Sequence, residues 1–290
     1  MGVIIIQIRR PLLIILMFVV AISFIITNNT KNDEELNDKI ITIQGVVKGK
    51  IEKKRYNQYK VGVFLINDYT KNKNLKIGQK VNITGKFKSL DKMKYDDFDY
   101  GRYIKSTGYK GIVYINNYKI IDKNKLYSLI GEIKFYISKT YRYLYKKNSD
   151  FINSILLAEV ENLTEEQKEI FTRTGTSHVI SISGLHTGIL CVIISFLLRG
   201  INKLYKLLIL SIFITLYCIM VGASPSIIRS IAFVMIFYLS IFIDRKKDGI
   251  SALSLIGIIL IMNNPYVIYN VSFQLSFLAT LSILIFYNKI

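Results

Sequence analysis

The stretch TGTSHVISISGLHTG, residues 174–188, decides how this chain is interpreted, because it holds both histidines and leads directly into the apolar run 189–198. Polar side chains at the entrance of a membrane helix are costly unless they face protein or water. The stretch is therefore a candidate functional site, and the apolar run that follows it is a candidate membrane helix.

Six apolar runs divide the sequence, and they cover about residues 11–26, 179–198, 207–222, 227–243, 250–262 and 268–286. Several are shorter than the roughly 20 residues of an unaided transmembrane helix, as helices buried inside a bundle can be. Arg9 and Arg10 precede the first run, and no small-residue cleavage site follows it. Residues 1–27 are therefore predicted to be an uncleaved N-terminal anchor helix.

Basic residues in the loops predict the direction of each helix. Lys and Arg follow the second, fourth and sixth apolar runs, whereas the short loops 223–226 and 263–267 contain neither. Because Lys and Arg mark the cytoplasmic side, every basic loop is cytoplasmic if the N-terminus is cytoplasmic. The sequence predicts a polytopic α-helical membrane protein of about six transmembrane helices, with residues 28–177 outside the cytoplasm.

The charge of the chain is strongly positive, with 39 Lys and Arg against 20 Asp and Glu and a formal net charge of +19. Residues 28–150 carry 27 of these basic residues. Such an excess favours polyanions, namely nucleic acid or anionic lipid, although a Lys-, Asn-, Ile- and Tyr-rich proteome would give the same composition. The two cysteines, Cys191 and Cys218, lie in apolar runs, so no disulfide framework is predicted for the polar part.

Residues 28–125 have the pattern of an inserted β-rich domain. Apolar residues alternate over 41–47 and 59–65, further β-like runs cover 81–87 and 111–115, and turn residues occur at 67–68 and 78–79. Short strands over about 80 residues are typical of an OB-like barrel, a fold that often binds oligonucleotides. A cluster of basic and aromatic residues is predicted to be exposed there, as a stacking and phosphate-binding surface for DNA or as a merely solvated hairpin. Its members are Lys53, Lys54, Arg55, Tyr56, Tyr59 and Lys60.

Residues 126–150 are predicted to form an amphipathic helix and linker. Apolar residues recur on one helical face over 126–147, with Lys and Arg among or opposite them. A basic amphipathic helix suggests a segment on the outer membrane surface, and packing against the helix bundle is the alternative. Thr164 and Gln167 then form a capping-box pattern that predicts a short helix over 165–172.

Four ordered motifs resemble the ComEC-type competence proteins, a family of bacterial DNA-uptake channels. The first is 171–178 continuing to 183–186, and the second is 98–104 followed by Gly108. The third is Asn264-Pro265 with 272–279, and 222–229 is a weaker fourth match. The resemblance implies an extracytoplasmic OB-like domain over 28–125 and a competence-type membrane domain over 151–290 that is incomplete. The metallo-β-lactamase-like domain of many members is absent from the sequence, and no P-loop occurs.

The resemblance implies a channel component in the bacterial cytoplasmic membrane that passes single-stranded DNA into the cytoplasm during natural competence. No covalent chemistry, metal or cofactor is predicted, because two histidines at the membrane cannot build a two-metal nuclease site. The implied partners are a DNA receptor, a cytoplasmic ATPase and the bilayer, and a homo-oligomer is a further option for closing a channel. The residues predicted to line the DNA path are His178, Ser181, Ser183, Gly184, His186, Thr187, Arg229, Gln274 and Ser276.

Other functions stay open at this level. Ser183 and His186 share a helical face and could serve a membrane hydrolase, although no third orienting group is evident. The same polar groups could simply join helices, and Arg229 could snorkel to the outer surface. A transporter of a smaller anionic solute and a truncated, inactive fragment are the remaining alternatives.

Overall fold

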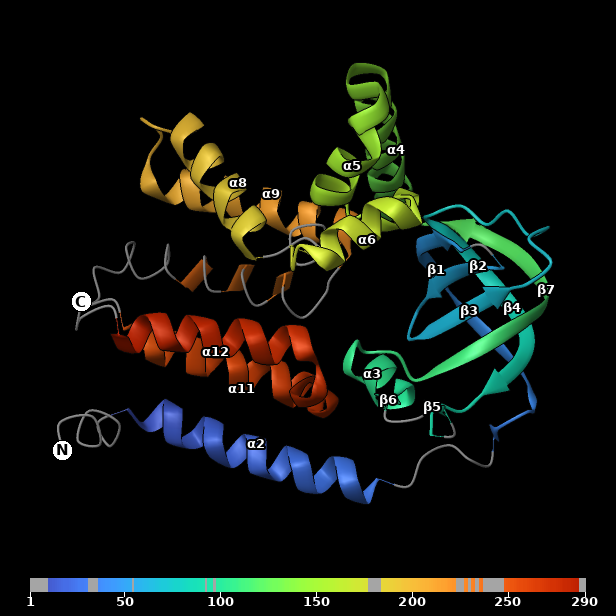
Figure 1. Ribbon diagram of the computed structural model, residues 1–290, viewed down its shortest axis with the longest axis horizontal. Helices are drawn as coiled ribbons and strands as arrows, with labels where there is room; N and C mark the ends of the chain where they lie inside the picture. Colours follow the sequence, from blue (N-terminus) through green and yellow to red (C-terminus); the bar gives the residue numbers. More distant parts are fainter. Residues whose placement is uncertain are drawn as a thin grey trace.

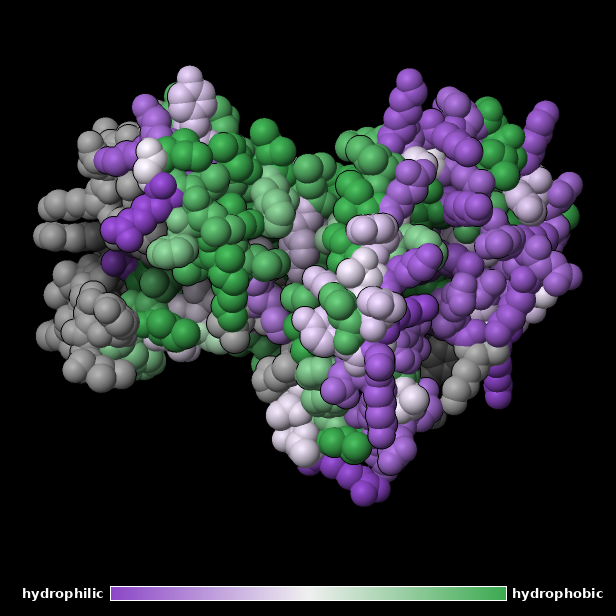
Figure 2. All heavy atoms as spheres, turned by 90° about the horizontal axis from the view of Figure 1, so that it is seen from above, coloured by the Kyte–Doolittle hydropathy of each residue, from purple (hydrophilic) through white to green (hydrophobic). Residues whose placement is uncertain are grey.

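The computed structural model describes residues 10–30, 36–53, 55–91, 93–95, 98–176, 184–222, 227–228, 231–232, 235–236 and 248–286. A β-barrel lies at one end of the molecule and apolar helices extend from it toward the other end (Figure 1). Figure 2 shows hydrophilic side chains gathered over the barrel end, with a hydrophobic zone over the helices beside it.

Five strands close the barrel, and their bounds are β1 Ile40–Glu52, β2 Asn57–Val61, β3 Phe64–Asp68, β4 Gln79–Lys88 and β7 Gly111–Lys123. The strand order is β1-β2-β3-β7-β4, with β4 pairing back to β1. Only the β3–β7 pair is parallel among these five. This is the topology of a five-stranded OB-type barrel, so the predicted OB-like domain is confirmed as a fold.

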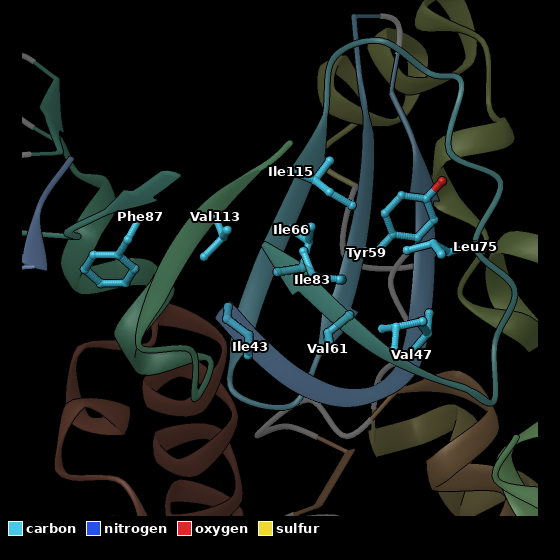
Figure 3. Close-up of a cluster of buried hydrophobic side chains, with 11 residues drawn as sticks. Ile43, Val47, Tyr59, Val61, Ile66, Leu75, Ile83, Phe87, Val113 and Ile115 are labelled. Atoms are coloured by element: carbon cyan, nitrogen blue, oxygen red, sulfur yellow. The ribbon is translucent and has the colours of Figure 1, made fainter. Parts of the chain in front are cut away.

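The barrel core forms because alternate residues of each strand point inward. On β4, Val81, Ile83 and Phe87 are at most 2% exposed, while Lys80 and Lys86 point outward. Figure 3 shows Ile83 near Ile66 of β3 and Val61 of β2 in this core. A packed apolar interior of this kind stabilises the barrel.

The run 59–65, predicted as one strand, is instead two strands of a hairpin. β2 ends at Val61, which pairs with Phe64 at the start of β3, and Gly62 and Val63 form the two-residue connection. Gly62 has a φ of 59°, which a glycine adopts without steric cost and which tight hairpins require. The predicted turn at 67–68 is shifted: Asn67 and Asp68 end β3, and the Asp68 carboxylate accepts from Thr70 N–H at 3.1 Å in the bend that follows.

The helices follow the predicted apolar runs with shifted ends. Their bounds are α2 Pro11–Asn29, α3 Tyr100–Ser106, α4 Lys125–Tyr145, α5 Ser149–Leu157, α6 Glu165–Arg173, α8 Gly184–Leu197, α9 Lys203–Val221, α11 Gly249–Asn263 and α12 Val271–Phe286, with short 3₁₀ turns η2 Lys146–Asn148, η3 Val160–Asn162 and η4 Pro265–Tyr269. Among the described residues, α2 and α9 are long and apolar enough to cross a membrane, and α8, α11 and α12 contain shorter apolar stretches. The structure therefore supports membrane helices, and the predicted total of six is not confirmed.

Two groups of helices form the apolar half. Leu16 of α2, Ile256 and Ile261 of α11 and Phe273 of α12 share one core, while Cys191, Leu210 and Ile214 join α8 to α9 in another. The described residues of the fourth apolar run contact both groups: Ile228, Ala232 and Ile236 pack on the first core, and Ile231 and Met235 pack on the second. These residues thus join the two helix groups.

The helices predicted over 126–147 and 165–172 correspond to α4 and α6. α4 begins one residue before the expected 126 and has exposed aromatic side chains, with Tyr136 72% and Tyr143 81% exposed. In Figure 1, α4 and α5 run across the direction of α2, α11 and α12. The capping box of α6 is present, with the Thr164 hydroxyl accepting from Gln167 N–H and the Gln167 side chain accepting from Thr164 N–H.

Candidate nucleic-acid interface

The loop that joins β1 to β2 holds part of the predicted DNA-binding surface. Lys53 Nζ donates to the Tyr56 hydroxyl at 3.0 Å and lies 5.0 Å from the centroid of that ring. Arg55 is exposed, and Lys54 lies outside the described residues. Lys53 also lines a cavity of about 560 Å³ with both acidic and basic groups, whose other lining residues are Glu52, Glu161, Leu163, Thr164, Glu165 and Lys168. The mixed charge means that this cavity by itself does not favour phosphate.

Tyr59 is a correction to the sequence interpretation, because it belongs to the barrel core. Its side chain is 0% exposed, and its hydroxyl donates to the Lys73 carbonyl. Burial raises the pKa of this phenol above its usual value. Lys60, the next residue on β2, points the other way and is half-buried, and burial lowers its pKa while nearby Glu161 opposes the shift. Neither residue is part of an open stacking surface.

A ladder of tyrosines occupies the place that Tyr59 was expected to take. The rings of Tyr56 and Tyr69 are 4.9 Å apart, and those of Tyr69 and Tyr114 are 5.8 Å apart, measured between centroids. Tyr56 and Tyr69 lie just beyond the last β2–β3 pair, Asn57 with Asp68, which explains their approach. Tyr114 joins them because β7 runs parallel to β3. Tyr69 is 55% exposed, so its ring is available to a ligand.

The ladder lies where OB-type barrels bind oligonucleotides, namely at strands 2 and 3 and the loops between strands 1–2 and 4–5. Here the second of these loops is 89–110, which contains a small hairpin, β5 Lys94–Tyr95 with β6 Phe98–Asp99, and the helix α3. Sequence reasoning missed Tyr69 and Tyr114, because no local pattern shows which strands become neighbours.

Helix α3 forms for local reasons and is fixed by packing. The Asp99 carboxylate accepts from Arg102 N–H at 2.8 Å and so begins the helix. Ile104 packs with Leu90 and Met93 against Leu65 of β3 and Ile112 of β7. The other face of α3 meets η4 in the helical half, where the Arg102 guanidinium lies 4.5 Å from the centroid of the Tyr269 ring. The barrel and the bundle therefore touch through α3.

The predicted path residues are only partly described. His178, Ser181, Ser183 and Arg229 lie outside the described residues. Gly184 begins α8, and His186 is half-buried there. Thr187 is 1% exposed, and its hydroxyl has no hydrogen-bond partner within the described part of the chain.

On α12, Gln274 Nε2 donates to the Ile268 carbonyl at 2.6 Å, and Ser276 is half-buried. Gln274 is exposed. Its described hydrogen bond joins the start of α12 to the preceding turn η4. Across the described ranges, no three His, Cys, Asp or Glu side chains come together as metal ligands would.

Comparison with known proteins finds a family match in the C-terminal part of the chain. Residues 155–290 match the model of the family described as Competence protein. The chain is 26% identical to ComE operon protein 3 of Bacillus subtilis (strain 168) over 165 residues, which are 56% of this chain and 21% of that protein. It is also 30% identical to an uncharacterized protein of Aquifex aeolicus (strain VF5) over 125 residues, or 43% of this chain and 30% of the other.

The match thus spans less than a third of the length of either relative. Among solved structures, the aspartyl tRNA synthetase from Entamoeba histolytica matches with a TM-score of 0.23 and 11% identity, over 65% of this chain and 44% of that one. A TM-score this low supports no statement about fold or function.

Proposed function

Since residues 155–290 belong to the competence protein family, we propose that this chain is a membrane component of DNA uptake that passes single-stranded DNA toward the cytoplasm. A polyanion cannot cross hydrocarbon, so such a protein must replace the water around each phosphate with fixed donors. The proposed role is transport, and no covalent step is assigned to any residue.

The observation that carries the proposal is the tyrosine ladder on an OB-type barrel next to the apolar helices. Tyr56, Tyr69 and Tyr114 offer a row of neighbouring, mutually tilted rings, and Lys53 and Arg55 add positive charge beside them. Proteins that bind single strands without sequence preference combine aromatic rings for the bases with basic groups for the backbone. This surface has both, whereas a transporter of a small anion would need no row of rings.

The proposed topology has six transmembrane helices, a cytoplasmic N-terminus and residues 28–177 outside the cytoplasmic membrane. Contacts at the barrel end support it. The loop 263–267, which has no Lys or Arg and is predicted to be outside, reaches the barrel through Asn264. The Tyr217 hydroxyl, near the end of α9 that precedes loop 223–226, donates to the Leu156 carbonyl of α5 at 3.1 Å. Both predicted outer ends therefore contact residues predicted to be outside.

The opposite end of the bundle fits the cytoplasmic side. Arg10, before α2, lies 3.6 Å from the Asp248 carboxylate, which caps α11. Both helices begin at this end and run toward the barrel. α4 would lie on the outer membrane surface with its exposed tyrosines at the headgroups, since it runs across the bundle direction.

The DNA path through the bundle is proposed from sequence and position. It would begin at residues 174–188 and include Thr187, whose buried hydroxyl lacks a partner among the described residues. Arg229 is proposed for the path from the sequence alone, because it lies outside the described residues. A DNA receptor outside, an ATPase in the cytoplasm and a second copy of the chain are the proposed partners.

Binding of the full chain in lipid nanodiscs to a fluorescent thymidine oligonucleotide tests the proposal. We expect affinity to fall with salt, and the Lys53→Ala variant to lower the slope of log affinity against log salt by about 0.7, the value for one phosphate contact on a single strand. Lys119→Ala, at an exposed lysine further along β7, serves as the matched control and should leave the slope unchanged. Salt-independent binding, or competition by inorganic phosphate alone, would reject DNA as the ligand.

A further inference from the structure

Two asparagines of the bundle hold the end of α3. Asn264 Nδ2 donates to the carbonyls of Lys105 and Ser106 at 2.8 and 3.3 Å, and Asn270 Nδ2 donates to the Ser106 hydroxyl at 3.1 Å. Ser106 is 1% and Asn270 4% exposed, so water cannot readily replace the bond between them. We call Lys105, Ser106, Asn264 and Asn270 the α3–η4 clasp.

In each asparagine, the side-chain oxygen and the NH₂ group make different hydrogen bonds. The Asn264 side-chain oxygen accepts from Tyr266 N–H and starts η4, and that of Asn270 accepts from Phe273 N–H at the start of α12, both at 3.1 Å. The oxygens therefore begin helices of the bundle, while the NH₂ groups face α3. Aspartate could perform the first task but has no donor for the second.

Aromatic and basic residues reinforce the clasp. Lys105 Nζ lies 5.1 Å from the centroid of the Tyr266 ring and pairs with Asp91 of the barrel loop at 2.6 Å. The hydroxyls of Tyr266 and Tyr269 in turn lie 2.8 Å from the hydroxyls of Thr30, which follows α2, and of Thr27 on α2. The surface that receives α3 is thus built from α2, η4 and the start of α12 together.

The clasp connects two bodies that each have their own core. The buried residues of the barrel core all lie between 43 and 115, and those of the α2–α11–α12 core lie at 16 and at 256–273. On the barrel side, Gly101 of α3 packs so closely on the loop that an added Cβ would be 1.8 Å from the Leu90 carbonyl oxygen. α3 is therefore fixed to the barrel, and opening the clasp would separate the bodies without emptying either core.

From this geometry we infer that the clasp positions the strand-binding face of the barrel over the outer end of the bundle, so that a bound strand is delivered to α12 and its neighbours. Asn264 and Asn270 are positioning residues in this scheme, because they act through α3 and contact no strand themselves. The inference rests on the proposed DNA-binding function of the barrel. It adds that binding and delivery are separable steps.

Photo-crosslinking separates the two steps in the full chain in nanodiscs. Benzoylphenylalanine is placed at Arg55 to report binding at the barrel, or at Gln274 to report arrival at the bundle, and the probe is a thymidine oligonucleotide. With Asn264→Asp we expect unchanged affinity and unchanged crosslinking at Arg55, and at least a tenfold loss of crosslinking at Gln274. Asn117→Asp makes the same charge change at an exposed site on β7 and should alter neither the affinity nor the crosslinking at either position.

The outcomes are distinct. Equal crosslinking at Gln274 in Asn264→Asp and in the unsubstituted chain would overturn the clasp while leaving the barrel function intact. Absence of DNA crosslinking at Arg55 in the unsubstituted chain would overturn the proposed function, and the clasp's role in delivery with it.

A disulfide lock decides the question if Asn264→Asp fails to fold. In a chain whose two native cysteines are replaced by alanine, an oxidised Ser106→Cys/Asn270→Cys pair should retain crosslinking at Gln274, because the scheme requires a closed clasp. Loss of that crosslink on oxidation and its return on reduction would overturn the inference.

Discussion

Tyr59 and Tyr69 offer a test that separates the barrel core from its binding face. Tyr59 is enclosed with Val47, Val61 and Leu75 and is 0% exposed, whereas Tyr69 is 55% exposed between two neighbouring rings. We predict opposite effects. Tyr59→Phe should lower the stability of the barrel and leave DNA affinity unchanged, and Tyr69→Ala should lower DNA affinity and leave stability nearly unchanged.

The magnitudes follow from what each change removes. Tyr59→Phe keeps the ring and leaves the half-buried Lys73 carbonyl without its donor, which costs about 1–3 kcal/mol of unfolding free energy. Tyr59→Ala also empties the ring's space, for a total of about 3–5 kcal/mol. Tyr69→Ala removes one stacking partner, worth about 1–3 kcal/mol per base, which corresponds to a roughly 5- to 150-fold higher Kd.

Two measurements on the same nanodisc samples decide the matter. Denaturant unfolding, followed by tyrosine fluorescence, reports the barrel, and fluorescence anisotropy of a labelled thymidine oligonucleotide reports binding. The reasoning is refuted if Tyr69→Ala binds within twofold of the unsubstituted chain, or if Tyr59→Phe weakens binding while the unfolding free energy stays constant. Either result would place the binding face elsewhere on the barrel.

Three further predictions concern stability and pH. Gly101→Ala should destabilise the barrel loop by about 1–3 kcal/mol or more, because the Leu90 carbonyl oxygen cannot move aside as a flexible side chain would; calorimetry of the chain measures it. Ala158 has a φ of 58°, a left-handed conformation that glycine adopts without strain. Ala158→Gly should therefore raise the unfolding free energy by about 0.5–1 kcal/mol, because the relief of strain exceeds the entropy that glycine adds to the unfolded chain. An unfolding free energy below that of the unsubstituted chain would contradict this. Burial raises the pKa of Tyr109 from 10.0 to about 12. The neutral phenol therefore contributes up to about 3 kcal/mol to the unfolding free energy below pH 10, and this contribution is lost as the pH rises toward 12. Tyr109→Phe should remove this fall in the unfolding free energy between pH 10 and 12.

Local elements could be predicted from the sequence because their signals are local. The apolar periodicity of α4 and the Thr164–Gln167 capping box both correspond to helices that begin within one residue of the expected position. The alternation over 41–47, 81–87 and 111–115 likewise marks strands β1, β4 and β7. Each pattern arises from contacts within a few residues, so it is visible before any tertiary structure is known.

The identity of the inward face could not be predicted in the same way. Alternation divides a strand into two faces but does not say which face is inward. In β2, both Tyr59 and Lys60 have long side chains that occur on the surface as well as at the rim of a core. The hairpin at Gly62 sets the register, and it turns Tyr59 inward. Tyr114 becomes part of the ladder only through the parallel β3–β7 pairing, which joins residues about fifty positions apart.

The predicted DNA path stays a prediction at His178, Ser181, Ser183 and Arg229, which lie outside the described residues. The family motifs did identify two segments, 98–108 and 264–279, without showing that they touch. The clasp explains their shared presence physically, since Asn264 must meet the carbonyl end of α3 for the barrel to sit on the bundle. Such a contact is invisible in sequence, because its two sides are about 160 residues apart.

The position of the clasp also bears on the direction of transport. It lies at the ends of α2 and α11 that are farthest from Arg10 and Asp248, so the barrel and the Arg10 end face opposite sides of the bundle. Loop charge, which is independent of this docking, predicts a cytoplasmic Arg10 end. Taken with the docking geometry, that charge pattern predicts that the tyrosine ladder lies outside. A strand bound there would meet the bundle at α3 and η4 first, and delivery would depend on the clasp before it depended on any residue of the path.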